Sequence, residues 1–212
     1  MNVDRSPTSP ELIDDPRFSF PQTRRWKTWE PGRERLFLKL LGEFRDRPAR
    51  FLEIGSFEGA SAIWMLRNVL THPESRLTCV DNDKLGCGRQ LEANLAASGL
   101  SSKAKIHWIN SHDVRKHVPD NHFDFVYVDG SHAAANVLFD VVNAYLICRP
   151  GGLVGCDDYL FELPEDGSVP KPAIDAFLQL VGDRVEVVHS GYQLWFRKRA
   201  DAAASGSGSS PI

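Results

Sequence analysis

Four short apolar segments of the chain each end in acidic residues. They are FLEIG with Glu53, LTCVD with Asp81, FVYVD with Asp129, and GGLVGCDD with Asp157 and Asp158. Such a continuous apolar run is typical of a strand buried on both faces of a parallel sheet. In open α/β sheets, ligands bind in the crevice beyond the carboxyl ends of the strands. The four segments therefore predict a single polar site assembled from four strand ends.

Segments with helical spacing separate these strands, and this alternation predicts an α/β fold with helices on both faces of the sheet. Near the end of the chain, RVEVVH and YQLWFRK are separated only by Ser190-Gly191, which predicts a hairpin and an antiparallel last strand. We therefore expect a Rossmann-like, doubly wound sheet of about seven strands, mostly parallel. The expected parallel strands are 49–55, 76–81, 104–110, 122–129 and 152–157, and the expected helices are 31–44, 59–70, 84–98, 133–148 and 171–181.

Length and composition suit one globular domain with loose ends. The chain has 212 residues, of which 42% are hydrophobic and 25% charged, as in ordinary soluble domains. Its first residues are rich in Pro, Asp and Ser, and its last residues in Gly and Ser, compositions that favour disorder. We expect a flexible segment at 1–17, an aromatic and helical cover at 18–48, the α/β domain at 49–199 and a disordered tail at 200–212.

Charge and hydropathy argue against several classes of partner. A formal net charge of −3 gives no reason to expect a nucleic acid or an anionic membrane as partner. No apolar stretch approaches the roughly 18–20 residues that span a bilayer, and the N-terminal sequence lacks the apolar region of a signal peptide. The cysteines lack CxxC spacing, so we expect reduced thiols in a cytoplasmic protein. They are Cys79, Cys87, Cys148 and Cys156.

A glycine turn follows the first strand. In FLEIGSFEGAS, Gly55 and Gly59 allow the backbone to approach a ligand and present N–H groups at a helix N-terminus. The segment is not GxGxxG, because Phe57 stands at the position of the second glycine. Glu53 and Glu58 make the turn better suited to a sulfonium or an ammonium group than to a phosphate. The alternative is a turn that only tightens the packing of strand and helix.

The second and third strand ends are candidates for nucleoside contacts. Asp81 lies about 20 residues beyond the glycine turn, where a carboxylate can accept hydrogen bonds from both hydroxyls of a ribose. The same spacing occurs in nicotinamide-binding folds, so it indicates a ribose more strongly than a particular cofactor. The polar segment Asn110–Asp113 is placed to reach an adenine edge, or Ser111 caps a short helix there.

The fourth and fifth strand ends contribute three carboxylates. Adjacent strands lie ~4.8 Å apart, so Asp129, Asp157 and Asp158 can converge, repel one another and raise one another's pKa. A hard divalent cation such as Mg²⁺ resolves this conflict; the alternative is that Asp157 or Asp158 caps the next loop and no metal binds. His132 begins a helix, where the positive N-terminus favours a neutral ring. It is our candidate base, or else a histidine with a capping or supporting role.

Taken in order, the motifs EIGSFEG, VDND, INSHD, FVYVDGSH and RPGGLVGCDDY, with the terminal hairpin, resemble class I S-adenosylmethionine-dependent methyltransferases. Within them the chain is similar to the small-molecule O-methyltransferase branch, the catechol O-methyltransferase-like group and its VDGSH-bearing relatives. The resemblance covers residues 49–198 and implies contacts to the methionine part, the ribose and the adenine, in that order along the chain. The implied cofactor-binding residues are Glu53, Gly55, Ser56, Gly59, Ser61, Asp81, Ser111, His112 and Asp129.

The resemblance also implies a metal and a base. In the metal-dependent branch the positions that match Asp129, Asp157 and Asp158 bind Mg²⁺, although the third is often an amide there. The proton acceptor of that branch is commonly a lysine, where this chain has His132. The single-glycine turn and Asp158 are the departures from the family pattern.

We therefore expect an enzyme that transfers a methyl group from S-adenosylmethionine to a hydroxyl of a small molecule, assisted by a divalent cation, with His132 and Asp129 catalytic. One alternative is a metal-independent O- or N-methyltransferase with His132 as base. The others are a nicotinamide-binding oxidoreductase and a non-catalytic S-adenosylmethionine-binding module. The acceptor is expected to contact three segments: Phe18–Trp29, the 158–170 loop with Tyr159 and Phe161, and the residues after His132. A homodimer is compatible with the sequence, which identifies neither the acceptor nor the oligomeric state.

Overall fold

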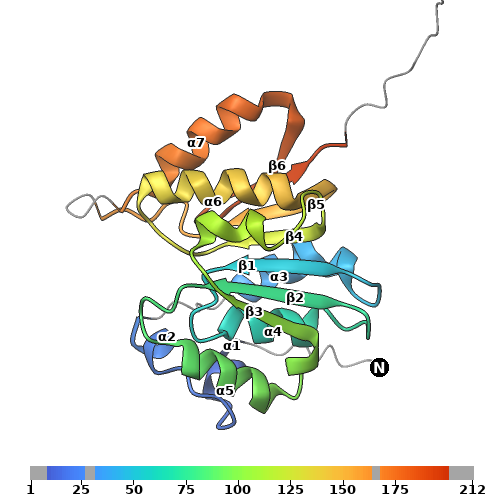
Figure 1. The fold of residues 1–212 in the computed structure, drawn as a ribbon, viewed down its shortest axis with the longest axis vertical. Helices are drawn as coiled ribbons and strands as arrows, with labels where there is room; N and C mark the ends of the chain where they lie inside the picture. The colour runs from blue at the N-terminus through green and yellow to red at the C-terminus, as the bar shows by residue number, and fades with distance from the viewer. Residues whose placement is uncertain (1–8, 27–31, 164–167, 201–212) are drawn as a thin grey trace, which may run out of the picture.

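The central element of the fold is a seven-stranded sheet with the order β3-β2-β1-β4-β5-β7-β6 (Figure 1). The computed structural model describes residues 9–26, 32–163 and 168–200. The first five strands are parallel, and β7 pairs antiparallel with both β5 and β6. These pairings confirm the predicted Rossmann-like fold and its antiparallel last strand. The strands are β1 (Arg50–Ile54), β2 (Arg76–Asp81), β3 (Ala104–Trp108), β4 (Phe123–Val128), β5 (Cys148–Cys156), β6 (Val185–Ser190) and β7 (Leu194–Lys198).

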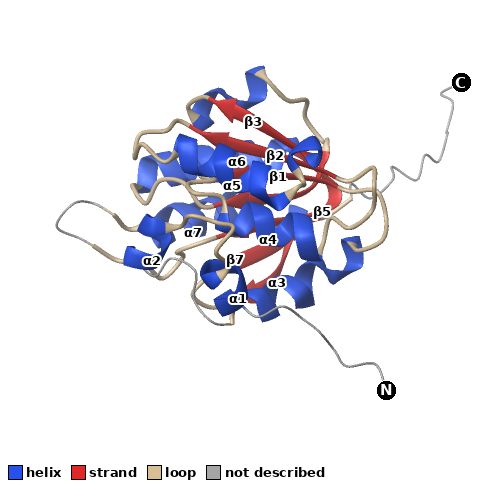
Figure 2. Ribbon diagram, turned by 90° about the horizontal axis from the view of Figure 1, so that it is seen from below, coloured by secondary structure: helices blue, strands red, loops and turns tan. Residues whose placement is uncertain are grey.

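Helices cover both faces of the sheet (Figure 2). One buried cluster contains side chains of α1, α3, α4 and α5, and the other contains side chains of η3, α6 and α7. Within the described ranges, no helix has both the length and the apolar character needed to cross a membrane. The helices are α1 (Ser9–Asp14), α2 (Pro21–Trp26), α3 (Arg33–Leu41), α4 (Ala60–Asn68), α5 (Gly88–Ser98), α6 (Ala134–Ile147) and α7 (Pro170–Val181), with short 3₁₀ turns η1 (Gly42–Phe44), η2 (Ser101–Lys103), η3 (Ser111–Lys116) and η5 (Gly182–Arg184).

The strand alternation of β1 decides which side chains reach each helical layer. Successive side chains of a strand point to opposite faces. Phe51 therefore packs in the α4 cluster, whereas Leu52 and Ile54 pack in the α6 cluster. Glu53 shares its face with Phe51 and accepts a hydrogen bond from Ser61 of α4. This placement puts a carboxylate beneath the glycine turn.

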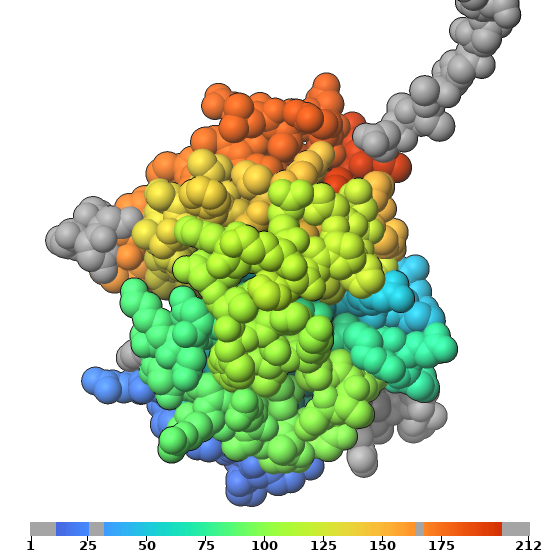
Figure 3. All heavy atoms as spheres, in the orientation of Figure 1, coloured from blue at the N-terminus to red at the C-terminus, as the bar shows by residue number. Residues whose placement is uncertain are grey.

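The α6 helix and the β3–η3 segment form a continuous surface on one side of the molecule (Figure 3). Val114 of η3 belongs to the same buried cluster as Val137 and Val141 of α6. Because these side chains hold η3 against α6, the two elements together wall one side of the crevice at the strand ends.

The segment 1–17, which we expected to be flexible, contains ordered structure over part of its length. Residues 9–14 form α1, and the Leu12 side chain is buried in the core cluster that includes Phe18. Asp15 accepts hydrogen bonds from Arg17, which ties the turn after α1. Over these residues the structure differs from the expectation, because Leu12 is an apolar anchor within a polar, proline-rich segment. The predicted flexible residues 1–8 and the predicted tail from 201 onward lie outside the described residues.

Two elements begin about four residues away from the predicted position. The β5 strand begins at Cys148 rather than at 152, because Cys148 pairs with Phe123 before a register shift. The α5 helix begins at Gly88 rather than at 84, because Asp83 accepts a hydrogen bond from the Gly88 backbone N–H and ends the preceding turn.

Candidate active site

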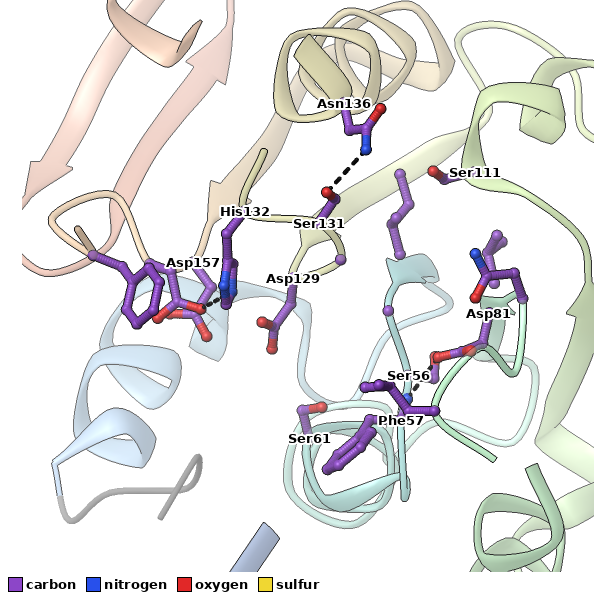
Figure 4. A pocket seen from close by; sticks show the side chains of 18 of the residues that line it. Ser56, Phe57, Ser61, Asp81, Ser111, Asp129, Ser131, His132, Asn136 and Asp157 are labelled. Atoms are coloured by element: carbon purple, nitrogen blue, oxygen red, sulfur yellow. Dashed lines mark hydrogen bonds and ion pairs between the residues drawn. The ribbon is translucent and has the colours of Figure 1, made fainter. Parts of the chain in front are cut away.

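A cavity of about 1280 Å³ opens at the carboxyl ends of β1, β2, β4 and β5. The strand order reverses between β1 and β4, and such a reversal is where open α/β sheets bind ligands. Figure 4 shows Asp129 between two groups of side chains: Ser56 and Asp81 lie on one side, and His132 and Asp157 on the other. We refer to these sides as the β1–β2 end and the β4–β5 end of the cavity.

The glycine turn lets the ends of β1 and β4 come together. Gly55 has a φ of +86°, and a Cβ atom there would lie 2.0 Å from the Asp129 carbonyl oxygen, so only glycine fits. Gly59 caps α4 with a φ of +85°. The Gly55 N–H donates to Val80 and the Asp129 N–H donates to Ile54, which extends the sheet to the edge of the cavity. The packing of the strand ends and the start of α4 thus require both glycines, and their contact with a ligand stays a prediction.

Glu53 lies beneath the cavity rather than in its wall. Its side chain is fully buried and accepts a hydrogen bond from the Ser61 hydroxyl, while Ser61 itself lines the cavity together with Ser56. Burial raises the pKa of Glu53 to about 7, although the Ser61 and Ser56 hydroxyls oppose the shift. Glu53 therefore affects the cavity indirectly: it orients the Ser61 hydroxyl and contributes negative charge when it is ionised.

Glu58 serves the helical cover and not the cavity. Its carboxylate accepts hydrogen bonds from the backbone N–H groups of Gln22 and Thr23, and from the Thr23 hydroxyl at 2.8 Å. These donors are the otherwise unpaired N–H groups at the start of α2. Glu58 does not line the cavity, and three hydrogen bonds hold its carboxylate to α2, so our interpretation of it as a direct attraction for a cationic ligand is wrong.

Asp81 is held by backbone donors on both carboxylate oxygens. The Phe57 N–H donates to Oδ2 at 2.9 Å, and the Asp83 N–H donates to Oδ1 at 2.7 Å. The carboxylate still lines the cavity, and each oxygen has a second lone pair for another donor. The predicted ribose contact thus finds a rigidly placed acceptor.

Ser111 and His112 both line the cavity at the start of η3. The residue that caps η3 is Asn110, whose side chain accepts a hydrogen bond from the His112 N–H at 3.0 Å. The alternative role of Ser111 as the cap is therefore wrong. The His112 ring stacks on Phe139 of α6, with 4.5 Å between the ring centroids, which fixes the ring at the cavity wall.

Asp140 of α6 is a buried carboxyl that the sequence did not single out. It is 1% exposed, and neither oxygen has a hydrogen-bond partner among the described residues. It lies behind Gly130, where a Cβ atom would be 3.5 Å from Asp140 Oδ2. Burial raises the pKa of Asp140 to about 6, although Ser111 opposes the shift. Its position within the apolar stripe of α6 gave no sequence signal.

The three predicted aspartates converge at the β4–β5 end. Asp129, Asp157 and Asp158 each offer one carboxylate oxygen, and these oxygens lie within 4.8 Å of one another. Burial raises the pKa of Asp129 well above its usual range, with a further contribution from the charge of Asp157. Asp158 adopts a φ of +53°, a conformation that aspartate tolerates better than most residues. Carboxylates arranged in this way can hold a hard cation.

Arg33, at the start of α3, is the main residue that sequence reasoning missed. Its Nη1 atom lies 2.6 Å from Asp157 Oδ2 and 3.7 Å from Asp129 Oδ2. Although burial opposes it, the neighbouring Tyr127 phenol and the carboxylates of Asp157 and Asp129 hold the pKa of Arg33 above its usual range. The other Asp157 oxygen accepts a hydrogen bond from Gln193 at 2.8 Å. Nothing in the sequence around Arg33 distinguishes it from a surface arginine.

His132 is paired with Asp158 in the same group. The His132 Nε2 atom lies 2.8 Å from Asp158 Oδ2, and the Phe161 ring packs against the imidazole with 4.5 Å between centroids. Although burial opposes it, the hydrogen bonds from His132 and Tyr192 hold the pKa of Asp158 below its usual range. An imidazole oriented by a carboxylate can accept a proton.

The aromatic residues that were predicted to contact the acceptor lie in different parts of the structure. Phe161 lines the cavity, as predicted for an acceptor contact, whereas Tyr159 is buried and donates to Asp175 of α7. Phe18 and Phe20 also belong to a predicted contact segment. Their side chains are buried in the core cluster and do not line the cavity. Trp29, which belongs to the same predicted contact segment, lies outside the described residues.

The fold and the site define a Rossmann-like α/β protein with a cofactor-sized cavity at its strand switch point. Residues 52–159 match the family model of a methyltransferase domain. The chain therefore belongs to this methyltransferase family, which confirms the class that its motifs resemble. A comparison with curated protein sequences finds no significant match.

Solved structures share the fold at low sequence identity. A protein from Corynebacterium glutamicum has a TM-score of 0.66 and 16% identity, over 96% of this chain and 94% of that one. The O-methyltransferase TomG from Streptomyces achromogenes, solved with S-adenosylmethionine, has a TM-score of 0.59 and 17% identity over 91% and 86%. An O-methyltransferase from Bacillus cereus, solved with S-adenosylhomocysteine, has a TM-score of 0.57 and 16% identity over 90% of both chains. At these identities the likeness concerns the fold alone.

Proposed function

We propose that the protein transfers a methyl group from S-adenosylmethionine to a hydroxyl of a small molecule, with the help of a divalent cation. The observation that carries this proposal is the convergence of Asp129, Asp157 and Asp158 in the cavity that the glycine turn also lines. The family supports methyl transfer. The O-methyltransferases from Streptomyces achromogenes and Bacillus cereus, solved with S-adenosylmethionine and S-adenosylhomocysteine, support the cofactor and the oxygen acceptor.

The β1–β2 end of the cavity suits the cofactor. Asp81 would accept hydrogen bonds from the ribose, since both its oxygens are already fixed by backbone donors. Ser111 and His112 would border the adenine, and Ser56 and the glycine turn would lie along the methionine part. The buried Glu53 below Ser61 favours a cationic group over a phosphate in that part of the cavity.

The β4–β5 end has donors that fit a divalent cation. Its three ligands are carboxylates, the oxygen donors that Mg²⁺ prefers, and Arg33 offsets only part of their negative charge. The raised pKa of Asp129 indicates a carboxylate whose charge the protein does not fully compensate. A divalent cation bound here would lower the pKa of an acceptor hydroxyl and orient it.

His132 would take the proton of the acceptor hydroxyl. The acceptor oxygen forms a bond to the methyl carbon as the carbon–sulfur bond breaks, so the hydroxyl proton must leave. The Asp158 carboxylate orients the imidazole and stabilises the positive charge that it gains. Phe161 packs on the ring and restricts the water that can reach it.

A metal-independent O- or N-methyltransferase is the second candidate. It is favoured by Arg33 and His132, which already pair with Asp157 and Asp158 in this structure. In that case the carboxylates would serve to orient the arginine and the base.

One experiment tests both candidates. Phenols, catechols, sugars and hydroxy acids would be screened for methyl transfer from S-adenosylmethionine, with Mg²⁺ and after exhaustive chelation. The proposal expects turnover that chelation abolishes and that Mg²⁺ restores. Full turnover after chelation would reject the cation and leave the metal-independent candidate. A thermal shift with NAD but none with S-adenosylhomocysteine would reject both.

A further inference from the structure

The acidic group at the β4–β5 end contains a cation supplied by the protein itself. Arg33 Nη1 contacts Asp157 at 2.6 Å and lies 3.7 Å from Asp129. The side chains of Arg33 and Asp157 are 12% and 2% exposed, so water screens this pair weakly. A guanidinium does not lose its proton in proteins. Any metal that shares these carboxylates therefore binds beside a permanent positive charge.

We propose that Arg33 sets the affinity of this site for divalent cations by competing with them for Asp157 and Asp129. The inference rests on the proposed function, because it takes the three aspartates as the ligands of the cation. At an effective dielectric constant of about 20, the repulsion between a guanidinium and a divalent ion about 4 Å away exceeds the thermal energy more than about tenfold. The arginine must weaken cation binding unless it moves away.

Arg33 also explains how the site persists without a cation. Three carboxylates whose oxygens lie within 4.8 Å repel one another when nothing positive lies between them. Arg33 contacts one carboxylate oxygen of Asp157, and Gln193 donates a hydrogen bond to the other. The Trp195 indole N–H in turn donates to the Gln193 side-chain oxygen at 2.9 Å. The arginine thus keeps the ligands assembled, and the cation that enters has to displace it or share its partners.

The arginine comes from the helical cover and not from the α/β domain. It occupies the first position of α3, whereas its partners Asp129 and Asp157 follow β4 and β5. The position of the helical cover relative to the sheet therefore affects the net charge at the three aspartates.

The test measures cation binding directly, without turnover. Isothermal titration with Mg²⁺ and with Mn²⁺ would compare the wild type with Arg33→Gln and with Arg33→Lys. We expect Arg33→Gln to bind each ion at least roughly tenfold more tightly, because it removes the charge, and Arg33→Lys to stay within about threefold of the wild type because it keeps the charge. Arg149→Gln is the matched control. It removes an ion pair of 2.7 Å with Asp124 at the other end of β4 and should leave the affinity unchanged.

Arg33→Gln leaves the buried Asp157 carboxylate without its arginine, so this variant can fail to fold. A second comparison, made within an Asp157→Asn protein, covers that case. Arg33→Gln would then be compared within Asp157→Asn, where no charge at position 157 is left unpaired, and should again bind the ions more tightly. Equal or weaker binding after the loss of Arg33, in a protein whose wild type binds the ions, would overturn the inference and leave the proposed function standing. Failure of every variant and of the wild type to bind either ion would overturn the inference together with the cation in the proposed function.

Discussion

The two ends of the cavity stabilise their carboxylates by different means. At the β1–β2 end the donors are neutral: a serine hydroxyl serves Glu53, and backbone N–H groups serve Asp81. At the β4–β5 end the donors include ionisable side chains: Arg33 serves Asp157 and His132 serves Asp158. The first set is fixed by the course of the chain, whereas the second can change its charge or be displaced.

This difference indicates a division of labour between binding and chemistry. Backbone N–H donors need no reorganisation and hold a carboxylate in one place, which suits a ligand that must be held the same way in every cycle. Side-chain ions suit a step in which a proton or a cation arrives and leaves. Changes at the β4–β5 end should therefore reduce turnover, and changes at the β1–β2 end should reduce cofactor binding.

Asp129→Ala should produce the largest effect. Asp129 lies between the two ends, and its loss removes one of three cation ligands. We expect turnover to fall by about a thousandfold or more, which corresponds to about 4 kcal/mol. The affinity for S-adenosylhomocysteine, measured by calorimetry, should change by less than about threefold, because most of the predicted cofactor contacts lie at the β1–β2 end. A comparable loss in both measurements would contradict the division between the two ends. Asp113→Ala, which removes a partly exposed carboxylate paired with Lys116 on η3, is the control.

His132→Ala should reduce turnover by about a hundredfold, the usual contribution of a general base. Its loss also removes the hydrogen bond to Asp158 Oδ2, so His132→Gln is needed to retain a hydrogen-bond donor without the base. Both variants should bind the cofactor normally. If His132→Gln keeps full activity in an assay across pH 6 to 9, the histidine only orients Asp158 and is not the base.

The sequence predicted the strand ends well because their geometry is a property of parallel sheets. Glu53 and Asp81 lie near the ends of β1 and β2, and Asp129 and Asp157 directly follow β4 and β5. Neighbouring parallel strands bring these ends to one edge of the sheet. Glu58 belongs to the same glycine motif but lies one turn further, where the start of α2 takes up its carboxylate. No local pattern reveals that contact, because it joins segments that only the packing of the cover brings together.

The same reason explains the residues that were missed. Arg33 begins an amphipathic helix, and Gln193 lies just before β7 in the terminal hairpin, and neither position is unusual in its own segment. They become part of the site only through the tertiary arrangement of α3, β5 and β7. Residues supplied by covering helices and hairpin turns are thus the part of such a site that a single sequence does not contain.

Asp140→Asn tests a carboxyl that lies behind both ends and should affect neither function. Because burial raises the pKa of Asp140 from 3.8 to about 6, the folded state binds a proton that the unfolded state releases. Wild-type stability should therefore fall as the pH rises from about 4 to about 6, by at most about 3 kcal/mol from this group. Asp140→Asn should be more stable than the wild type at pH 8 in urea unfolding, and this advantage should shrink toward pH 4. An advantage that does not depend on pH would show that Asp140 is not the group responsible.

Asp81→Ala should give the smallest functional effect and the sharpest test of the β1–β2 end. The substitution removes the predicted acceptor of the ribose hydroxyls and releases the Phe57 and Asp83 N–H groups. A charge-assisted hydrogen bond contributes about 1.5–3 kcal/mol, so the dissociation constant for S-adenosylhomocysteine should rise roughly tenfold or more in calorimetry. Turnover at saturating cofactor should fall by less than about threefold, because the base and the cation ligands are untouched. Asp81→Asn keeps an acceptor for one backbone N–H and therefore separates the loss of loop contacts from the loss of charge. Weaker binding that is intermediate between wild type and Asp81→Ala would assign part of the loss to the loops. Binding as weak as that of Asp81→Ala would assign the loss to the carboxylate charge. Unchanged affinity in both variants would place the ribose elsewhere in the cavity.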